Sequence, residues 1–127
     1  MRKPSSPPAA FQDFIRRFPR LGSAWGLASE EGRHGPLDKP TQQLVKLAVA
    51  VGALREGAVH SAVRKALDAG IAPEALEQVV ALAASTIGFP PSVAAWCWVR
   101  DVLAPGGRKP GSKPGSKKHK AVRRRRT

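Results

Sequence analysis

Two side chains that could share a proton lie one helical turn apart in the stretch REGAVHSAVRKAL, residues 55–67. Glu56 and His60 are four residues apart, and a helix brings such residues onto the same side. A carboxylate beside an imidazole fixes the orientation of the ring, so the pair is a reasonable arrangement for general acid–base catalysis. The alternative is an ordinary pair at the edge of a helix, half solvated or packed against a neighbouring chain.

Three further side chains could line a substrate pocket near this helix. Arg55 could bind a substrate carboxylate, although an Arg at a helix start is more often solvated. His34 lies in the loop sequence EEGRHGP and could face a pocket or solvent. Trp96 could stack on a ligand, but Trp25, Trp96 and Trp98 are expected mainly in the core or in interfaces.

The His and Cys residues match no metal-binding pattern. The chain has three His and one Cys, and their spacing fits no common ligand set, so neither a metal site nor another cofactor is predicted. A single cysteine also excludes a disulfide within the chain and a CxxC motif. The apolar neighbours of Cys97 predict a buried, unreactive thiol.

Apolar residues recur at helical spacing along most of the chain, and no stretch alternates with a period of two. Helices are predicted within residues 11–18, 21–28, 41–54, 55–70, 71–88 and 89–103. Asp38 or Thr41 could cap the third helix, and Gly70 and Gly88 could end the fourth and fifth. The sequence therefore predicts an all-α domain of about five or six helices over residues 9–104.

The predicted helix over residues 41–54 is apolar around much of its circumference, so it is expected to be central and mostly buried. Several other helices are also apolar on more than one face. This excess favours burial by other copies of the chain, a homo-oligomer, over a monomer with a crowded core.

Charge is concentrated at the C-terminal end. Residues 106–127 contain ten of the 22 basic residues and none of the nine acidic ones, so the rest of the chain has a net charge of only +3. Residues 1–8 and 105–127 lack the apolar residues needed for a core and are predicted to be disordered. No secretory signal and no membrane-spanning run is recognised, so a soluble, cytoplasmic protein without membrane contact is expected.

The basic tail suggests a function of its own. A run of cations binds phosphates with strong salt dependence and little sequence specificity, and the tail has no aromatic residue to stack on bases. Weak, non-specific contact with nucleic acid or another polyanion is one interpretation, and a solubilising tail is the other. The candidate contacts are Lys117, Lys118, Lys120, Arg123, Arg124, Arg125 and Arg126.

Over residues 11–103 the chain resembles the carboxymuconolactone decarboxylase family, which includes the alkylhydroperoxidase D-like proteins. The most specific segments are LDKPTQQLVKLAVAVGA, EGAVHSAVRKALDAGIAPEALEQVV and GFPPSVAAW. The resemblance implies an all-helical fold, assembly into trimers or hexamers, and either a peroxidase (peroxiredoxin-type) or a decarboxylase activity on a small organic substrate.

The residues that carry peroxidase chemistry in the family are replaced here. By the resemblance, its two motif cysteines correspond to Arg55 and Ala58, its histidine to Ala62 and its proton-relay Glu to Gln43. Without thiols the peroxidase reaction is not expected. The decarboxylase branch needs no thiol, although its helix histidine also corresponds to Ala62. His60 is rotated by about 200° from that position and would face a different pocket, one that could lie between subunits.

Two hypotheses follow. The first is a family enzyme with Glu56 and His60 as catalytic residues and with Arg55, Gln43, His34 and Trp96 as substrate contacts. The second is a non-catalytic oligomeric binding protein that keeps the fold and uses its basic tail to contact polyanions.

Overall fold

The structure, a computed structural model, describes residues 8–104 and contains six α-helices in that range. They are α1 (Ala9–Arg17), α2 (Pro19–Glu31), α3 (Lys39–Gly52), α4 (Glu56–Asp68), α5 (Pro73–Ile87) and α6 (Phe89–Leu103). The all-α prediction is confirmed. The predicted disordered segments and the seven candidate tail contacts, from Lys117 to Arg126, fall almost entirely on residues 1–7 and 105–127, outside the described residues.

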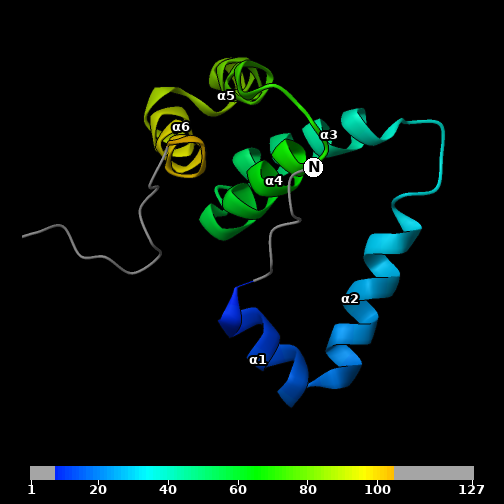
Figure 1. The fold of residues 1–127 in the computed structure, drawn as a ribbon. Coiled ribbons are helices and arrows are strands. Elements are labelled where there is room, and N and C mark those ends of the chain that lie inside the picture. The colour runs from blue at the N-terminus through cyan, green and yellow to red at the C-terminus, as the bar shows by residue number, and fades with distance from the viewer. Residues whose placement is uncertain (1–7, 105–127) are drawn as a thin grey trace, which may run out of the picture.

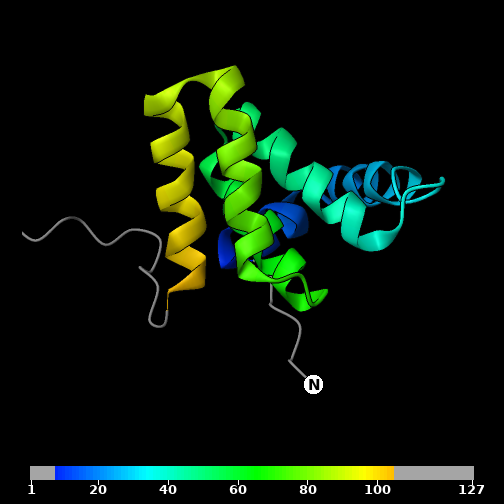
Figure 2. The ribbon, with the colours of Figure 1, turned by 90° about the horizontal axis from the view of Figure 1, so that it is seen from above.

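Four of the helices form a closed ring of neighbours. Helix α3 packs on α4 and α5, and α6 packs on the same two helices. Figure 2 shows α5 and α6 running side by side in opposite directions, with α3 and α4 behind them. The helices α3 to α6, called the four-helix unit below, contain every buried residue of the described chain.

The core of the four-helix unit consists of aliphatic side chains of moderate size. Its largest fully buried members are Leu47, Leu76, Val51, Val59, Val63 and Val99. Four residues of α4 are buried at a spacing of three, one and three, which is the pattern of a single helical face (Val59, Ala62, Val63 and Ala66). Helix α4 therefore lies against the core along most of its length, and this packing holds its other side chains in fixed positions.

The other two helices form a separate hairpin. Helices α1 and α2 pack mainly on each other, and neither contains a buried residue. Figure 1 shows this hairpin extending away from the four-helix unit as a V-shaped arm. Its contacts are largely aromatic: the rings of Phe11 and Trp25 meet edge to face at 6.3 Å, and those of Phe14 and Phe18 lie 5.2 Å apart.

The turns between helices use specific caps. The Asp38 side chain accepts a hydrogen bond of 2.9 Å from the Thr41 N–H, so Asp38 and not Thr41 caps α3. Gly70 has a φ of 84° at the end of α4, and the Ile71 N–H donates to the Ala66 carbonyl. This is the Schellman ending that a glycine favours. Gly88, with φ 84° and ψ 171°, joins α5 to α6.

One prediction about burial is wrong for the single chain. In α3 only Leu47, Ala50 and Val51 are buried, and Val49 is 65% exposed. Val49 is two positions from both Leu47 and Val51, a rotation of about 200° that places it on the far side of the helix. The helix is apolar on two sides, but the four-helix unit covers only one of them.

Candidate functional site

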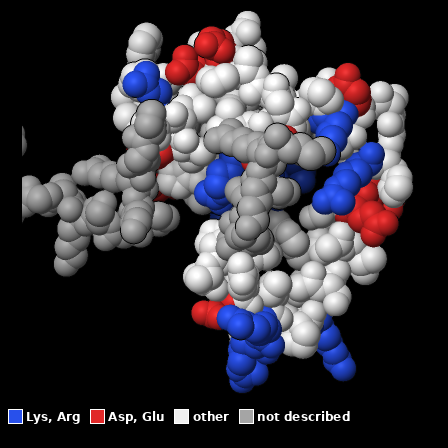
Figure 3. All heavy atoms as spheres, in the orientation of Figure 1, with Lys and Arg blue, Asp and Glu red and all other residues white. Residues whose placement is uncertain are grey.

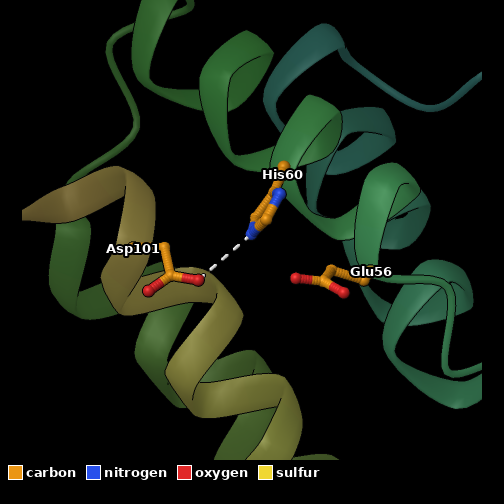
Figure 4. Close-up of side chains that lie close together, drawn as sticks. All are labelled: Glu56, His60 and Asp101. Atoms are coloured by element: carbon orange, nitrogen blue, oxygen red, sulfur yellow. Dashed lines mark ion pairs between the residues drawn. The ribbon is translucent and has the colours of Figure 1, made fainter. Parts of the chain in front are cut away.

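Glu56, at the start of α4, and His60, one turn later, lie beside Asp101 near the end of α6 (Figure 4). The His60 Nε2 atom is 3.4 Å from the Asp101 Oδ2 atom. One carboxylate oxygen of Glu56 completes a group of three atoms that all lie within 4.8 Å of one another. These three residues are called the acid–histidine cluster below.

The cluster is held by the packing of two core helices. Val59 and Val63, on the neighbouring face of α4, are fully buried, and so is Val99 on α6. Because α4 and α6 pack directly on each other, His60 and Asp101 face one another across their contact. The cluster therefore lies on rigid elements, as a site that must hold its geometry requires.

The imidazole of His60 is well shielded, whereas the carboxylates are not. The His60 side chain is 18% exposed and that of Asp101 is 34% exposed, while Glu56 lies at the surface. The Nε2 atom is buried, and although its distance to Asp101 is that of an ion pair, no hydrogen bond of good geometry reaches it from the described residues. Because the contact with Asp101 is not a well-aligned hydrogen bond, the shielded ring nitrogen can still exchange a hydrogen bond or a proton with a substrate atom.

Sequence reasoning found two of the three members. The spacing of four residues correctly placed Glu56 beside His60, but the closest carboxylate to the ring comes from Asp101, 41 positions later. No local pattern marks that residue, since it is one Asp beside an Arg near the end of a mainly apolar helix. Only the packing of α6 on α4 brings it to the histidine.

The other candidate site residues are not members of the cluster. Arg55 is the exposed N-cap residue of α4, directly before Glu56. His34 is exposed in the loop after α2. Trp96 lies in a shallow groove between α5 and α6 that none of the three cluster residues lines, and the Arg100 guanidinium stacks over its ring at 5.1 Å.

Gln43 has one unusual property. Its Oε1 atom is buried in α3 and has no hydrogen-bond partner among the described residues. An unsatisfied buried amide oxygen costs free energy, so such atoms are uncommon and often face a missing donor. Gln43 therefore stays a candidate contact for a substrate or for a neighbouring chain.

The prediction for Cys97 is wrong, because its thiol is exposed. The buried face of α6 consists of Ser92, Ala95 and Val99, and Cys97 is two residues from both Ala95 and Val99. Two residues turn a helix by about 200°, so the cysteine faces away from the core. Apolar neighbours in the sequence did not reveal which side of the helix would be covered.

The acid–histidine cluster also has the composition of a metal site. One imidazole and two carboxylates suit Zn²⁺, Mn²⁺ or Fe²⁺. The spacing of residues in the sequence does not reveal this combination, because Asp101 is far from His60 along the chain. The three ligand atoms lie up to 4.8 Å from one another and would have to move closer to bind an ion. Ligand atoms at about 2.1 Å from a metal lie roughly 3 to 4 Å apart.

Comparison with known proteins gives one match. The sequence pattern of the carboxymuconolactone decarboxylase family matches residues 19–101, about two thirds of the chain. No curated protein and no solved structure matches it. No helix of the described residues is long and apolar enough to cross a membrane.

Proposed function

Since the chain belongs to the carboxymuconolactone decarboxylase family, we propose that it catalyses a thiol-independent, decarboxylase-type reaction on a small carboxylated substrate. The observation that carries the proposal is the buried Nε2 atom of His60, which lies beside two carboxylates and makes no well-aligned hydrogen bond. The acid–histidine cluster is the catalytic centre in this proposal, in a position two residues from the one that the family uses.

The chemistry needs one well-placed proton. When the substrate's carboxylate leaves as CO₂, the bond between it and the neighbouring substrate carbon breaks. The electron pair of that bond stays on the substrate carbon, where a conjugated carbonyl can delocalise it. That carbon must then take a proton, and protonated His60 can deliver it through Nε2. Asp101 pairs with the same Nε2 atom at 3.4 Å while no substrate is bound, and Glu56, exposed at the opening of the cluster, can return a proton from solvent.

The residues at the family's thiol positions support a reaction without cysteine. Arg55 and Ala58 cannot attack a peroxide, and the exposed Cys97 has no second thiol in the chain to resolve a sulfenic acid. Arg55 is placed to attract a substrate carboxylate toward the start of α4.

Assembly with further copies of the chain is part of the proposal. Large apolar side chains are exposed on three different helices, with Trp25 of α2 at 61%, Val49 of α3 at 65% and Phe89 of α6 at 81%. Surfaces of this kind normally mark an interface. We expect a homo-oligomer, a trimer or hexamer by analogy with the family, and light scattering coupled to size exclusion would measure its mass. A monomer would contradict this part of the proposal.

The test is CO₂ release from carboxymuconolactone by the full-length protein, with peroxide turnover under a dithiol reductant as the parallel assay. We expect decarboxylation that is unchanged in Cys97→Ser and lower by a factor of about 10² to 10⁴ in His60→Gln, the loss typical of a missing acid–base group. Circular dichroism would show that both variants fold. Peroxide turnover that depends on Cys97, or decarboxylation that persists in His60→Gln, would refute the proposal.

A further inference from the structure

A concave site with basic side chains lies on a different face of α4 from the acid–histidine cluster. It has a volume of about 540 Å³ and is bounded by α2 and the loop after it on one side and by α3 and α4 on the other. Its lining includes three basic side chains, Arg33, Lys46 and Lys65, and one acidic side chain, Glu30. Trp25 and Leu27 supply an apolar wall. The volume lies in the range of sites that hold small organic molecules.

This basic pocket is distinct from the acid–histidine cluster. Lys65 and His60 share α4, but they are five residues apart, which separates them by about 140° around the helix and roughly 7.5 Å along it. None of the three cluster residues lines the basic pocket. A ligand in one site would therefore contact a different face of α4 from a ligand in the other.

The three cations are brought together without compensation. Among the described residues, no ion pair involves Arg33, Lys46 or Lys65, so the two positive charges in excess over Glu30 face the pocket unneutralised. Burial lowers the pKa of Lys65, and the charges of Lys46, Arg33 and Arg64 lower it further. Like charges that a fold holds close together mark a place where an anion would relieve repulsion.

The loop that carries Arg33 is fixed by hydrogen bonds. The Nε2 atom of Gln42 donates to the carbonyl oxygens of Arg33, at 3.2 Å, and of Leu37, at 2.8 Å. Asp38 caps α3 directly after this loop. Figure 3 shows Lys and Arg side chains, with Asp and Glu side chains beside them, where the end of α2 and this loop approach the four-helix unit. The geometry of the basic pocket is thus held by α3, the helix that also carries Lys46.

We propose that the basic pocket binds a small organic polyanion, one that carries phosphate groups or several carboxylates beside an apolar part. Arg33, Lys46 and Lys65 contact the charged groups, and Trp25 and Leu27 contact the apolar part. This is a binding site separate from the proposed catalytic centre.

The test is isothermal titration of the full-length protein with pyrophosphate and with citrate, which distinguish phosphate from carboxylate ligands. Lys46→Ala and Lys65→Ala are expected to weaken binding of at least one probe by about tenfold each, since a charge-assisted hydrogen bond contributes about 1.5 kcal/mol or more. Arg20→Ala is the control, because it removes the same charge from α2, a helix that lines the pocket, whereas Arg20 itself does not line it and does not affect the pKa of Lys65.

A second readout guards against unstable variants. Lys65→Gln removes a repelled cation, so it should raise the melting temperature without ligand and reduce the rise that the probe produces. Equal weakening of binding in Arg20→Ala would point to the overall charge of the chain, including its basic tail, and would overturn the proposal. So would the absence of binding of both probes at millimolar concentration.

Discussion

The hairpin α1–α2 and the four-helix unit both contain many apolar residues but use them differently. Among the described residues, every buried side chain belongs to the four-helix unit, and the hairpin has none. The hairpin instead exposes five large apolar side chains: Phe14, Phe18, Leu21, Trp25 and Leu27. Stability within one chain thus comes from α3 to α6. The hairpin has few contacts with the four-helix unit, and its exposed apolar side chains are the basis for expecting assembly.

The two sites reflect the same division. The acid–histidine cluster lies between α4 and α6, inside the four-helix unit, and its geometry depends on core packing. The basic pocket lies where the hairpin meets that unit, between α2 and the helices α3 and α4. A change in the hairpin should therefore affect the basic pocket and the assembly before it affects the cluster.

The largest expected difference between the two regions is in how much a Leu→Ala substitution lowers the free energy of unfolding. Leu47 is fully buried and Leu27 is 69% exposed. Leu47→Ala should lower the free energy of unfolding by about 2 to 5 kcal/mol, because it removes buried surface and leaves a cavity. Leu27→Ala, measured by urea denaturation at a concentration where the protein is monomeric, should change it by less than about 0.5 kcal/mol. Equal losses would contradict the division.

The turn between α5 and α6 should be the next most sensitive position. Gly88 has φ 84° and ψ 171°, a conformation that residues with a Cβ atom rarely adopt. Gly88→Ala should lower the free energy of unfolding by about 1 to 3 kcal/mol through backbone strain. Gly26→Ala in the hairpin is the control, since a Cβ there meets nothing within 4 Å and the residue is helical. That control should be neutral or slightly stabilising in thermal melts.

A smaller effect, of opposite sign, is expected where α3 ends. Leu54 has a φ of 53°, the left-handed conformation that favours glycine, and its side chain is 46% exposed. Leu54→Gly should raise the free energy of unfolding by about 0.5 to 1 kcal/mol, because relief of the left-handed strain exceeds the lost contacts and chain entropy. A clear loss of stability would show that Leu54 packs on something that the single chain lacks, such as a second copy.

The smallest effect concerns pH at the joint between the regions. The hydrogen bonds from Thr41 lower the pKa of Asp38 below its ordinary value of 3.8. A carboxyl whose pKa is lower in the folded state stabilises the fold above its unfolded pKa, and that contribution disappears as the pH falls through the folded pKa. Asp38→Asn can still cap α3 but has no carboxyl group to protonate. The free energy of unfolding of this variant should therefore fall slightly less than that of the wild type when the pH drops below about 4. An unchanged acid profile would contradict this.

Much of the fold follows from local patterns in the sequence, whereas the site does not. Helical periodicity, the capping residue Asp38 and the glycines at 70 and 88 place the helices within a few residues. Periodicity shows that a helix has apolar faces but not which neighbour covers them. For that reason Cys97 was wrongly placed in the core, and Asp101 was not recognised as the partner of His60. Both depend on the packing of α6 against α4 and α5.

The central claim is that His60 and Asp101 act as one catalytic unit, and a double-mutant cycle tests it most directly. The measurement is kcat/KM for CO₂ release by the wild type, His60→Gln, Asp101→Asn and the double variant. If Asp101 acts by positioning His60, the double variant will be no slower than His60→Gln alone. Losses that multiply, or a wild type that releases no CO₂ from the carboxylated lactone, would contradict the claim.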